Sequence, residues 1–510
     1  MAFLKKHHYL ILIILIIILS ACLRFWRLPE YMTFLGDEGR DALAVKRMIV
    51  DHKLRLIGPV TSVGNMYLGP LYYYLMLPAM MVSFLSPVGP AVMVALLGIL
   101  TTALIYFYGR EWIGNKGSLA AALLYAVSPV IITFSRSSWN PNVMPFFAIL
   151  STYGIWRVWQ RKQFFWLAIL GVTLSFALQS HWLGLLLLPT IFIFWLMSLI
   201  EILKSKKSSK SFWLQTFLGF LAFLFLAIAP LVWFDLRHNY LNSQAFLSFI
   251  NESGGSVGFK FYDFFPRLWN LSKTIFTNLV AGKDVFWGFW LTLIISLVVV
   301  LKIIQEIILD RGCGLVKRSP GLFLLLVWFL TGILGLSFYH QNIYDHYFGF
   351  LFPVPFLLVG WLLGIFLERK ILGKMITVLV ICGLLFLAVK QSPLRYQPNK
   401  QLQKTESIAA FVLEKANGQP FNLALVAERN YDEAYAFFME KWGQPPTRID
   451  PQQAEQTITS QLFVICEQDD CQPTVNPKAE IAMFGWSIID EEWQVEGVKI
   501  YKLSHNPDQK

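Results

Sequence analysis

The chain has 510 residues, of which 56% are hydrophobic and 15% are charged, and its mean hydropathy is +0.53. Soluble globular proteins are about 45–50% apolar and about 25% charged, and one or two water-soluble domains cannot bury this apolar excess. The composition therefore excludes a soluble cytosolic enzyme and a disordered or fibrous protein. With this hydropathy, the net charge of +11 indicates basic membrane loops, and we expect no nucleic-acid partner.

The first apolar segment covers residues 8–22 and follows Lys5 and Lys6. It is similar to a signal peptide, but Arg24 and Arg27 come after it in place of a cleavage site with small residues. We therefore predict an uncleaved first transmembrane helix that enters the membrane from the cytoplasm.

Ten further apolar runs are long enough to cross a bilayer of about 30 Å. They lie near 89–109, 117–134, 143–159, 164–181, 183–203, 212–233, 284–304, 320–339, 347–367 and 371–390. Another run, 69–86, is interrupted by Pro70 and Pro78, and we interpret it as a juxtamembrane or re-entrant helix. The sequence thus predicts about eleven spans.

The distribution of basic residues predicts the orientation. Five loops together hold 16 lysines and arginines, whereas the short alternate loops hold only Arg136. The positive-inside rule places the five basic loops in the cytoplasm, together with the N-terminus. We therefore expect a multi-pass protein of the cell (plasma) membrane with three extracytoplasmic regions: 26–88, 234–283 and everything after 390.

Residues 391–510 differ in kind from the rest of the chain, because they hold 11 basic and 17 acidic residues. Helix-like stretches (405–416, 431–442) alternate there with strand-like ones (421–427, 462–466, 495–503), which is typical of a small α/β domain. We therefore divide the chain into a membrane domain, 1–390, and a small extracytoplasmic domain, 391–510. Cys466 and Cys471 either form a disulfide in an oxidising compartment or remain two free thiols.

A polar motif, Gly36-Asp37-Glu38-Gly39-Arg40-Asp41, follows the first span and precedes the apolar-faced run 42–50. A purely structural interpretation is a helix start in which Asp37 caps and the other acids favour the positive end of the dipole. A functional interpretation makes Asp37 a base at the membrane surface. The two interpretations are compatible.

Other polar residues are predicted at the same membrane face. Arg136 is either a snorkelling arginine or a phosphate contact, because a guanidinium matches phosphate oxygens. Arg237 and His238 follow a span, and Asp345 and His346 precede another. Each signal alone is weak, and they form a site only if the fold brings them together.

The external region 234–283 contains Gly254-Gly255 and an aromatic run over 259–269. This composition suits a segment on the bilayer surface. It either packs against the spans in the ordinary way or forms a mobile loop that covers a groove for a lipid substrate.

The motifs carry a resemblance to a known family. Gly-Asp-Glu-Gly-Arg at 36–40 is followed by Gly-Pro-Leu-Tyr-Tyr-Tyr at 69–74, Tyr-Gly-Arg at 108–110, Ser-Pro at 128–129, and Asp-His-Tyr at 345–347 before Phe-Pro-Val-Pro at 352–355. In order and topological position they resemble GT-C membrane glycosyltransferases. The similarity is greatest to the protein O-mannosyltransferase-like and aminoarabinose-transferase-like branch (Rgt-type, family 39/83-like), and it covers roughly residues 8–390.

This resemblance implies a polytopic α-helical GT-C enzyme that transfers a sugar from a polyprenyl-phosphate-linked donor lipid. The acceptor, a glycan, lipid or protein that the sequence does not identify, is modified at the extracytoplasmic face with inversion. Asp37 is the implied base and Glu38 the paired acid. The donor phosphate is assigned to Arg237 and Arg136, with His238 and His346 behind them, and the remaining substrate-site positions are Tyr72, Asn140 and Asp345.

The sequence departs from the family pattern at two positions. Asn140 and Asn142 stand in a loop where some relatives carry an acid, so no metal site or other cofactor is indicated, although a divalent metal is not excluded. Gly69 stands where aminoarabinose-transferase-like members carry a lysine before the proline.

The alternative function is a transporter or flippase for a lipid-linked solute. A transporter would need ionisable residues near mid-membrane and paired broken helices. The predicted span interiors are almost free of charge, and this favours the glycosyltransferase.

Overall fold

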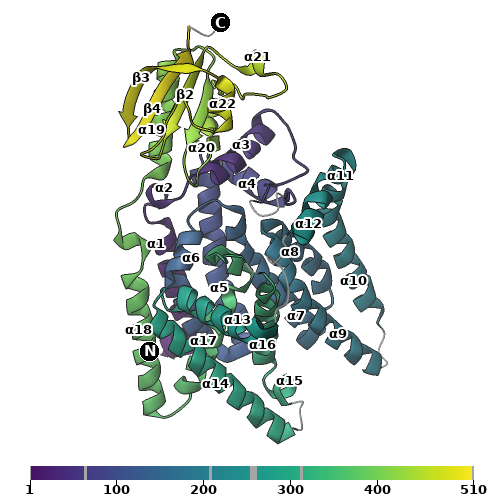
Figure 1. The fold of residues 1–510 in the computed structure, drawn as a ribbon. Helices are drawn as coiled ribbons and strands as arrows, with labels where there is room; N and C mark the ends of the chain where they lie inside the picture. The colour runs from purple at the N-terminus through teal and green to yellow at the C-terminus, as the bar shows by residue number, and fades with distance from the viewer. Residues whose placement is uncertain are drawn as a thin grey trace.

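The computed structural model describes residues 2–61, 66–205, 209–252, 261–310, 314–339 and 341–507. A body of helices carries a small sheet with its own helices at one end (Figure 1). The helices before the sheet region are α1 (Ala2–Phe25), α2 (Leu28–Tyr31), α3 (Gly36–Val50), α4 (Leu71–Val82), α5 (Val88–Val127), α6 (Pro129–Phe134), η1 (Asn140–Val143), α7 (Met144–Arg161), α8 (Trp166–Ser180), η2 (Trp182–Leu186), α9 (Leu187–Ser205), α10 (Lys210–Phe223), η3 (Leu224–Ile228), α11 (Ala229–Arg237), α12 (Leu241–Glu252), α13 (Phe261–Ile275), η4 (Phe276–Val280), α14 (Val285–Asp310), α15 (Gly314–Arg318), α16 (Pro320–Ser337), η5 (Asp345–Leu351), α17 (Pro353–Leu367) and α18 (Ile371–Lys390).

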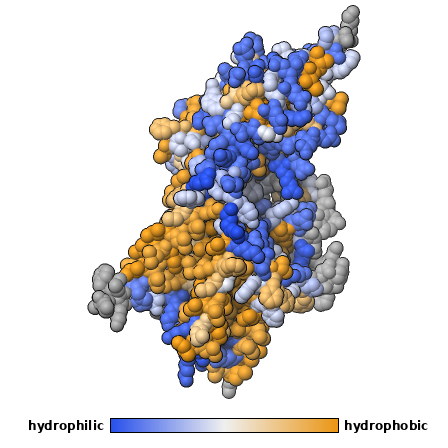
Figure 2. Space-filling model, turned by 90° about the vertical axis from the view of Figure 1, so that its left-hand side faces the viewer, coloured by the Kyte–Doolittle hydropathy of each residue, from blue (hydrophilic) through white to orange (hydrophobic). Residues whose placement is uncertain are grey.

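Within the described residues, seven helices are long and apolar enough to cross a membrane, or eight if η5 and α17, which are bent by 61°, form one span. Figure 2 shows a broad apolar surface over the lower half of the molecule and a hydrophilic upper part. The structure therefore confirms a polytopic helical membrane protein. The figure of eleven spans stays a prediction.

The 40-residue helix α5 explains part of the difference between the eleven predicted spans and the seven or eight helices that are long enough to cross a membrane. Gly114 lies inside it with φ 77° and ψ 168°, a non-helical conformation that breaks α5 into two segments. This break lies between the predicted spans 89–109 and 117–134. Just beyond it, a Cβ atom on Gly117 would lie 2.7 Å from the carbonyl oxygen of Gly360, so only glycine allows α5 and α17 to approach this closely.

Helix α4 corresponds to the proline-interrupted run 69–86. It has 12 residues and contains Pro78. At 1.5 Å per residue such a helix is about 18 Å long, which is too short for a hydrocarbon core of about 30 Å. This length agrees with a helix that does not cross the membrane completely.

The C-terminal part forms an α/β unit, as the sequence predicted. Its strands are β1 (Asn422–Val426), β2 (Gln461–Cys466), β3 (Ser487–Val495) and β4 (Val498–His505). The sheet order is β1-β2-β4-β3, with β1 parallel to β2 and the other pairs antiparallel. The accompanying helices are η6 (Pro393–Arg395), α19 (Gln401–Ala416), α20 (Glu433–Lys441), α21 (Ala454–Thr457) and α22 (Ala479–Phe484).

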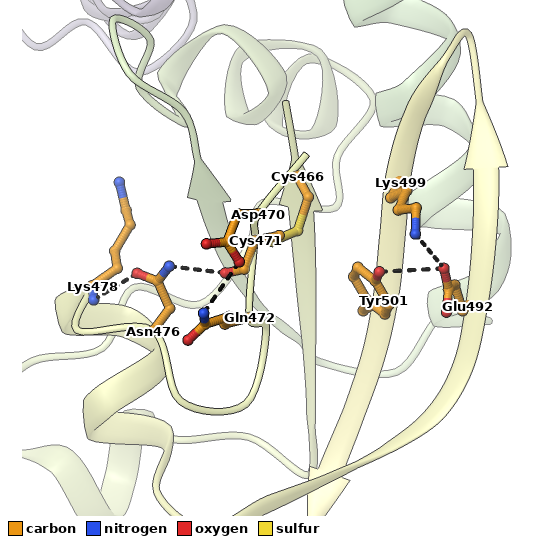
Figure 3. Close-up of a disulfide and its surroundings, with 9 residues drawn as sticks. All are labelled: Cys466, Asp470, Cys471, Gln472, Asn476, Lys478, Glu492, Lys499 and Tyr501. Atoms are coloured by element: carbon orange, nitrogen blue, oxygen red, sulfur yellow. Dashed lines mark hydrogen bonds and ion pairs between the residues drawn. A yellow bond between two sulfur atoms is a disulfide. The ribbon is translucent and has the colours of Figure 1, made fainter. Parts of the chain in front are cut away.

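A disulfide joins Cys466, at the end of β2, to Cys471 (Figure 3). The Cys471 carbonyl accepts a hydrogen bond from Asn476 Nδ2 at 2.9 Å, and Asn476 Oδ1 accepts one from the Lys478 N–H at 3.1 Å. The disulfide thus anchors the segment that leads into α22.

We expect the double substitution Cys466→Ser and Cys471→Ser to lower the free energy of unfolding of the C-terminal unit by about 2 kcal/mol, because it restores the loop entropy of the unfolded chain. Thermal unfolding of the purified protein with and without reductant measures this. A melting temperature that is the same for both proteins, and insensitive to reductant, would contradict the expectation.

The C-terminal unit packs directly on α3. A Cβ atom on Gly39 would lie 2.4 Å from Ala434 Cα, so α3 and α20 are in backbone contact. At the other end of the contact, Glu440 pairs with Lys46 at 3.2 Å and with Arg47 at 2.5 Å. This interface determines how the start of α3, with its acidic motif, is oriented.

Candidate active site

A cavity of about 570 Å³ lies where the helix ends meet the C-terminal unit. One wall comes from the start of α3 and from residues 60–61 and 66–68, and a second from η1, η2 and η5. The third wall belongs to the C-terminal unit. The lining residues are Gly36, Asp37, Arg40, Val60, Thr61, Met66, Leu68, Trp139, Asn140, Pro141, His181, Trp182, Leu183, Phe249, Tyr339, His346, Tyr347, Tyr431, Asp432, Glu433, Lys478 and Glu480.

Asp37 lies in the first turn of α3 and lines this cavity with about a third of its side chain exposed (34%). Arg40 Nη1 donates to Asp37 Oδ1 at 2.9 Å, and Arg40 Nε donates to the fully buried Asp41 at 3.0 Å. Although burial opposes a charged guanidinium, Asp41 and Asp37 raise the pKa of Arg40 above its usual value. A permanent cation therefore orients the Asp37 carboxylate.

The two family-like motifs meet in the same network. Tyr73, from the Gly-Pro-Leu-Tyr-Tyr-Tyr motif on α4, donates its hydroxyl to Asp41 Oδ1 at 3.3 Å. Asp41 thus connects α4 to Arg40, and Arg40 holds Asp37.

The helix start is capped by Glu38 and not by Asp37, which corrects the purely structural interpretation of the motif. Residue Leu35 takes the N-cap position, and its N–H donates to Glu38 Oε2 at 3.0 Å. The Glu38 side chain is buried and accepts its hydrogen bond from the backbone N–H of Leu35. It does not belong to the described lining of the cavity. Its position favours support of the helix start over contact with substrate.

Burial raises the pKa of Glu38 from 4.5 to about 7, although the Leu35 N–H opposes this shift. An acid whose pKa is higher in the folded state binds more protons there than in the unfolded state. Stability should therefore fall as the pH rises from about 4.5 to about 7. We expect Glu38→Gln, which keeps the acceptor oxygen, to flatten this slope in thermal unfolding measured across that range. An unchanged slope would exclude Glu38 as its source.

Two other predicted residues line the cavity beside Asp37. Asn140 is buried, and its Nδ2 donates to the Ser180 carbonyl at 2.7 Å. The His346 ring lies 4.5 Å from the Trp139 ring and 6.0 Å from the His181 ring. His181 Nδ1 accepts the Leu183 N–H, so the neutral ring carries its proton on Nε2.

Arg136 was assigned to the donor phosphate, but it does not belong to the described cavity lining. It is buried, and its guanidinium donates to the carbonyls of Leu23 (2.7 Å), Arg24 (3.1 Å) and Trp26 (2.6 Å) at the end of α1. This buried guanidinium caps the end of a helix and does not belong to the described cavity lining, so it does not meet a phosphate bound in the cavity. The structure therefore gives Arg136 a role in fixing α1.

Arg237 and His238 lie at the exposed end of α11, outside the described cavity lining. His238 stacks on Phe234 with ring centroids 4.2 Å apart, and its Nδ1 lies 2.8 Å from the Phe234 carbonyl. Nearby, Asp235 caps α12 by accepting the N–H groups of Asn242 and Ser243.

Tyr72 and Asp345 also lie outside the described lining. Tyr72 is buried and shares a 2.8 Å hydrogen bond with Ser138. Asp345 accepts from Asn278 at 2.7 Å and pairs with Lys283 at 3.2 Å. Tyr72 therefore connects α4 to the segment before η1, and Asp345 connects η5 to the segment around η4.

The external region 234–283 contributes Phe249 of α12 to the lining. The Gly254-Gly255 pair and the beginning of the aromatic run, up to residue 260, lie outside the described residues. The hypothesis of a covering loop stays a prediction.

Sequence reasoning did not assign several lining residues. Arg40 was part of the quoted motif, and its position three residues after Asp37 on a helix was a signal for an ion pair. The residues of the C-terminal unit gave no such signal, because nothing in their sequence says that this unit packs on α3.

Comparisons with known proteins agree with this architecture. Residues 69–234 match the family model described as dolichyl-phosphate-mannose-protein mannosyltransferase. No curated protein matches the chain. ArnT from Cupriavidus metallidurans, solved bound to undecaprenyl phosphate, superposes with a TM-score of 0.60 at 12% identity, covering 97% of this chain and 98% of that one.

The oligosaccharyltransferase AglB from Archaeoglobus fulgidus is also similar. Its complex with an inhibitory peptide and a dolichol-phosphate gives a TM-score of 0.54 at 12% identity, over 90% of this chain and 70% of that one. A structure of the Archaeoglobus fulgidus oligosaccharyltransferase with Zn and sulfate gives 0.52 at 15% identity, over 89% and 67%.

The chain has a GT-C fold. The resemblance inferred from the short motifs is thereby confirmed at the level of the GT-C fold. The family-model match begins at Gly69 and so includes the Gly-Pro-Leu-Tyr-Tyr-Tyr motif, whereas the GT-C likeness to ArnT extends over nearly the whole chain, including the C-terminal unit.

One relative in this fold was solved with Zn, which raises the question of a metal site. Within the part of the chain that the structure describes, no group of three or more His, Cys, Asp or Glu side chains is arranged to hold a metal ion. The cavity carboxylate Asp37 is already engaged by Arg40 at 2.9 Å. We derive no catalytic step through a metal.

Proposed function

We propose that this GT-C protein transfers a sugar from a polyprenyl-phosphate-linked donor to a hydroxyl-bearing acceptor, with inversion and with Asp37 as the base. One observation carries the proposal: Asp37 is a partly exposed carboxylate in the cavity between the helix ends and the C-terminal unit. The relatives solved with undecaprenyl phosphate and dolichol-phosphate support a polyprenyl phosphate as the carrier.

In the proposed reaction the acceptor hydroxyl gives its proton to the free oxygen of Asp37 as its oxygen attacks C1 of the donor sugar. The bond between C1 and the phosphate oxygen breaks, and the electron pair leaves with the lipid phosphate. Attack from the face opposite the phosphate inverts C1. Proton removal by a positioned carboxylate contributes roughly 10²–10⁴-fold to such reactions.

Cationic and N–H donors near the leaving phosphate lower the barrier by stabilising its charge. Of the residues assigned to this role from the sequence, His346 lines the cavity, and we retain it. We add Arg40, because Nη1 and Nη2 each carry a second N–H beyond their contacts with Asp37 and Asp41. The proposal leaves out Arg136, Arg237 and His238, because none of them belongs to the described lining of the cavity.

The orientation and the domain division belong to the same proposal. The basic loops indicate a cytoplasmic N-terminus, an extracytoplasmic unit 391–510 and residence in the cell membrane. This orientation agrees with a cavity that opens on the side of the C-terminal unit.

Reconstituted vesicles with a labelled polyprenyl-phosphate sugar test the function against the alternative of a flippase. We expect label to move to a water-soluble or lipid acceptor, and to stay on the carrier when Asp37 is replaced. Movement of intact donor lipid between leaflets, without transfer of sugar, would support the flippase and contradict the proposal.

A further inference from the structure

The cavity has two chemically different sides. Among the described lining, the residues from positions 60–61 and 66–68, from η1, η2 and η5, and Phe249 and Tyr339 include no carboxylate. The C-terminal unit contributes three carboxylates and one lysine, together with an aromatic ring: Tyr431, Asp432, Glu433, Lys478 and Glu480. We call this second set the C-terminal wall.

The C-terminal wall lies beside the proposed base. A Cβ atom on Gly36 would lie 2.3 Å from a ring carbon of Tyr431, so the Tyr431 ring packs directly over the residue before Asp37. The Gly36 N–H donates to Asn430 Oδ1 at 2.8 Å, which fixes the adjacent backbone. A molecule bound on this wall is therefore next to Asp37.

The carboxylates of the wall are incompletely paired. Glu433 pairs with Arg448 at 3.5 Å. Glu480 Oε2 is buried and has no hydrogen-bond partner among the described residues. Burial, followed by the charge of Glu433, raises the pKa of Asp432 to about 6. All three carboxylate side chains nevertheless line the cavity, where they can accept hydrogen bonds from a bound molecule.

These properties separate the two substrates. The donor phosphate is anionic and carboxylates repel it, so we place it toward His346 and the N–H groups of Arg40, away from the three carboxylates of the C-terminal wall. The C-terminal wall instead presents hydrogen-bond acceptors and an aromatic face. Hydroxyl groups supply the donors that the carboxylates lack, and the C–H face of a sugar ring packs against an aromatic ring.

Resting on the function proposed above, we propose that the C-terminal wall binds the acceptor, and that this acceptor is a glycan without acidic groups, held through its hydroxyls by Asp432, Glu433 and Glu480 and packed on Tyr431. The disulfide loop is hydrogen-bonded through Asn476 to Lys478 (Figure 3). Glu480 lies in the first turn of α22, directly after Lys478 and Ala479.

Binding to the full-length protein in detergent tests this proposal without turnover. Methyl β-glucoside is the neutral probe and methyl β-glucuronide the anionic one, and saturation-transfer NMR measures the binding of each. We expect the glucuronide to bind about tenfold more weakly, because the carboxylates of the wall repel its own carboxylate. The difference should shrink in the double variant Asp432→Asn, Glu480→Gln, which is isosteric, and persist in the control Glu414→Gln on the exposed face of α19.

Equal or tighter binding of the glucuronide, or a difference that the double variant leaves unchanged, would overturn the proposal. So would a lack of binding by both glycosides together with saturable binding of a serine-containing peptide. Because the measurement needs no donor, a protein that binds the glucoside as expected but transfers no sugar would refute the proposed function and leave the assignment of the wall intact.

Discussion

Replacing Asp37 with asparagine should reduce sugar transfer by roughly 10²–10⁴-fold, the usual contribution of a positioned general base. Asparagine has nearly the same shape and keeps an oxygen that can accept the 2.9 Å hydrogen bond from Arg40. It has no basic oxygen, so it cannot take the proton of the acceptor hydroxyl. The expected defect is therefore in kcat, with little change in the binding of the donor lipid.

Transfer of labelled sugar and equilibrium binding of the donor lipid, measured on the same preparation, separate these effects. The matched control is Asp51→Asn, the same substitution at the other end of α3, where the carboxylate lies 4.0 Å from Lys53. The control should transfer sugar at the wild-type rate. If the Asp37 variant also does so, Asp37 is not the base.

Asp432 provides a second comparison, because it is another carboxylate of the same cavity. If Asp37 is the base, Asp432→Asn should raise the apparent KM for the acceptor more than it lowers kcat. A loss of kcat in that variant as large as the loss expected for Asp37→Asn would move the role of base to the C-terminal unit.

The sequence was sufficient for the membrane class, because that class depends on local patterns. Apolar runs identify helices in a bilayer without knowledge of their partners. The motif after the first span marks several carboxylates, and only the fold distinguishes Asp37, which lines the cavity, from the buried Glu38 and Asp41. In the C-terminal unit, β1, β2 and β4 have buried apolar residues and were predicted, whereas the edge strand β3, with the acidic run 490–492, was not.

Contacts between distant segments limited the prediction of the site. Arg136 has the residue type of a phosphate ligand, but its partners are carbonyls of residues more than 100 positions earlier in the chain. Tyr431 reaches the cavity only because the C-terminal unit packs on α3, through Gly39 and Ala434. Neither contact has a periodicity or a spacing that a single sequence displays.

The contact at Gly39 leads to the second large expected effect. A methyl group in Gly39→Ala would lie 2.4 Å from Ala434 Cα and 2.5 Å from Ala434 N. These are backbone atoms of α20, so no side-chain rotation relieves the overlap, and overpacking of this kind costs about 1–3 kcal/mol. We expect α20 to move away from α3, and transfer to fall at least about tenfold, because the C-terminal wall is then displaced from Asp37.

Zero-length cross-linking with a carbodiimide reports this displacement directly. Lys46 Nζ lies 3.2 Å from Glu440 Oε1 across the same interface, so the wild-type protein should form this cross-link efficiently. The yield should fall in Gly39→Ala. It should be unchanged in Gly364→Ala, where the new methyl group would have no neighbour closer than 3.4 Å. Full activity in Gly39→Ala together with a lost cross-link would show that transfer does not need the C-terminal wall beside Asp37, and the acceptor would then have to bind among the helix ends alone.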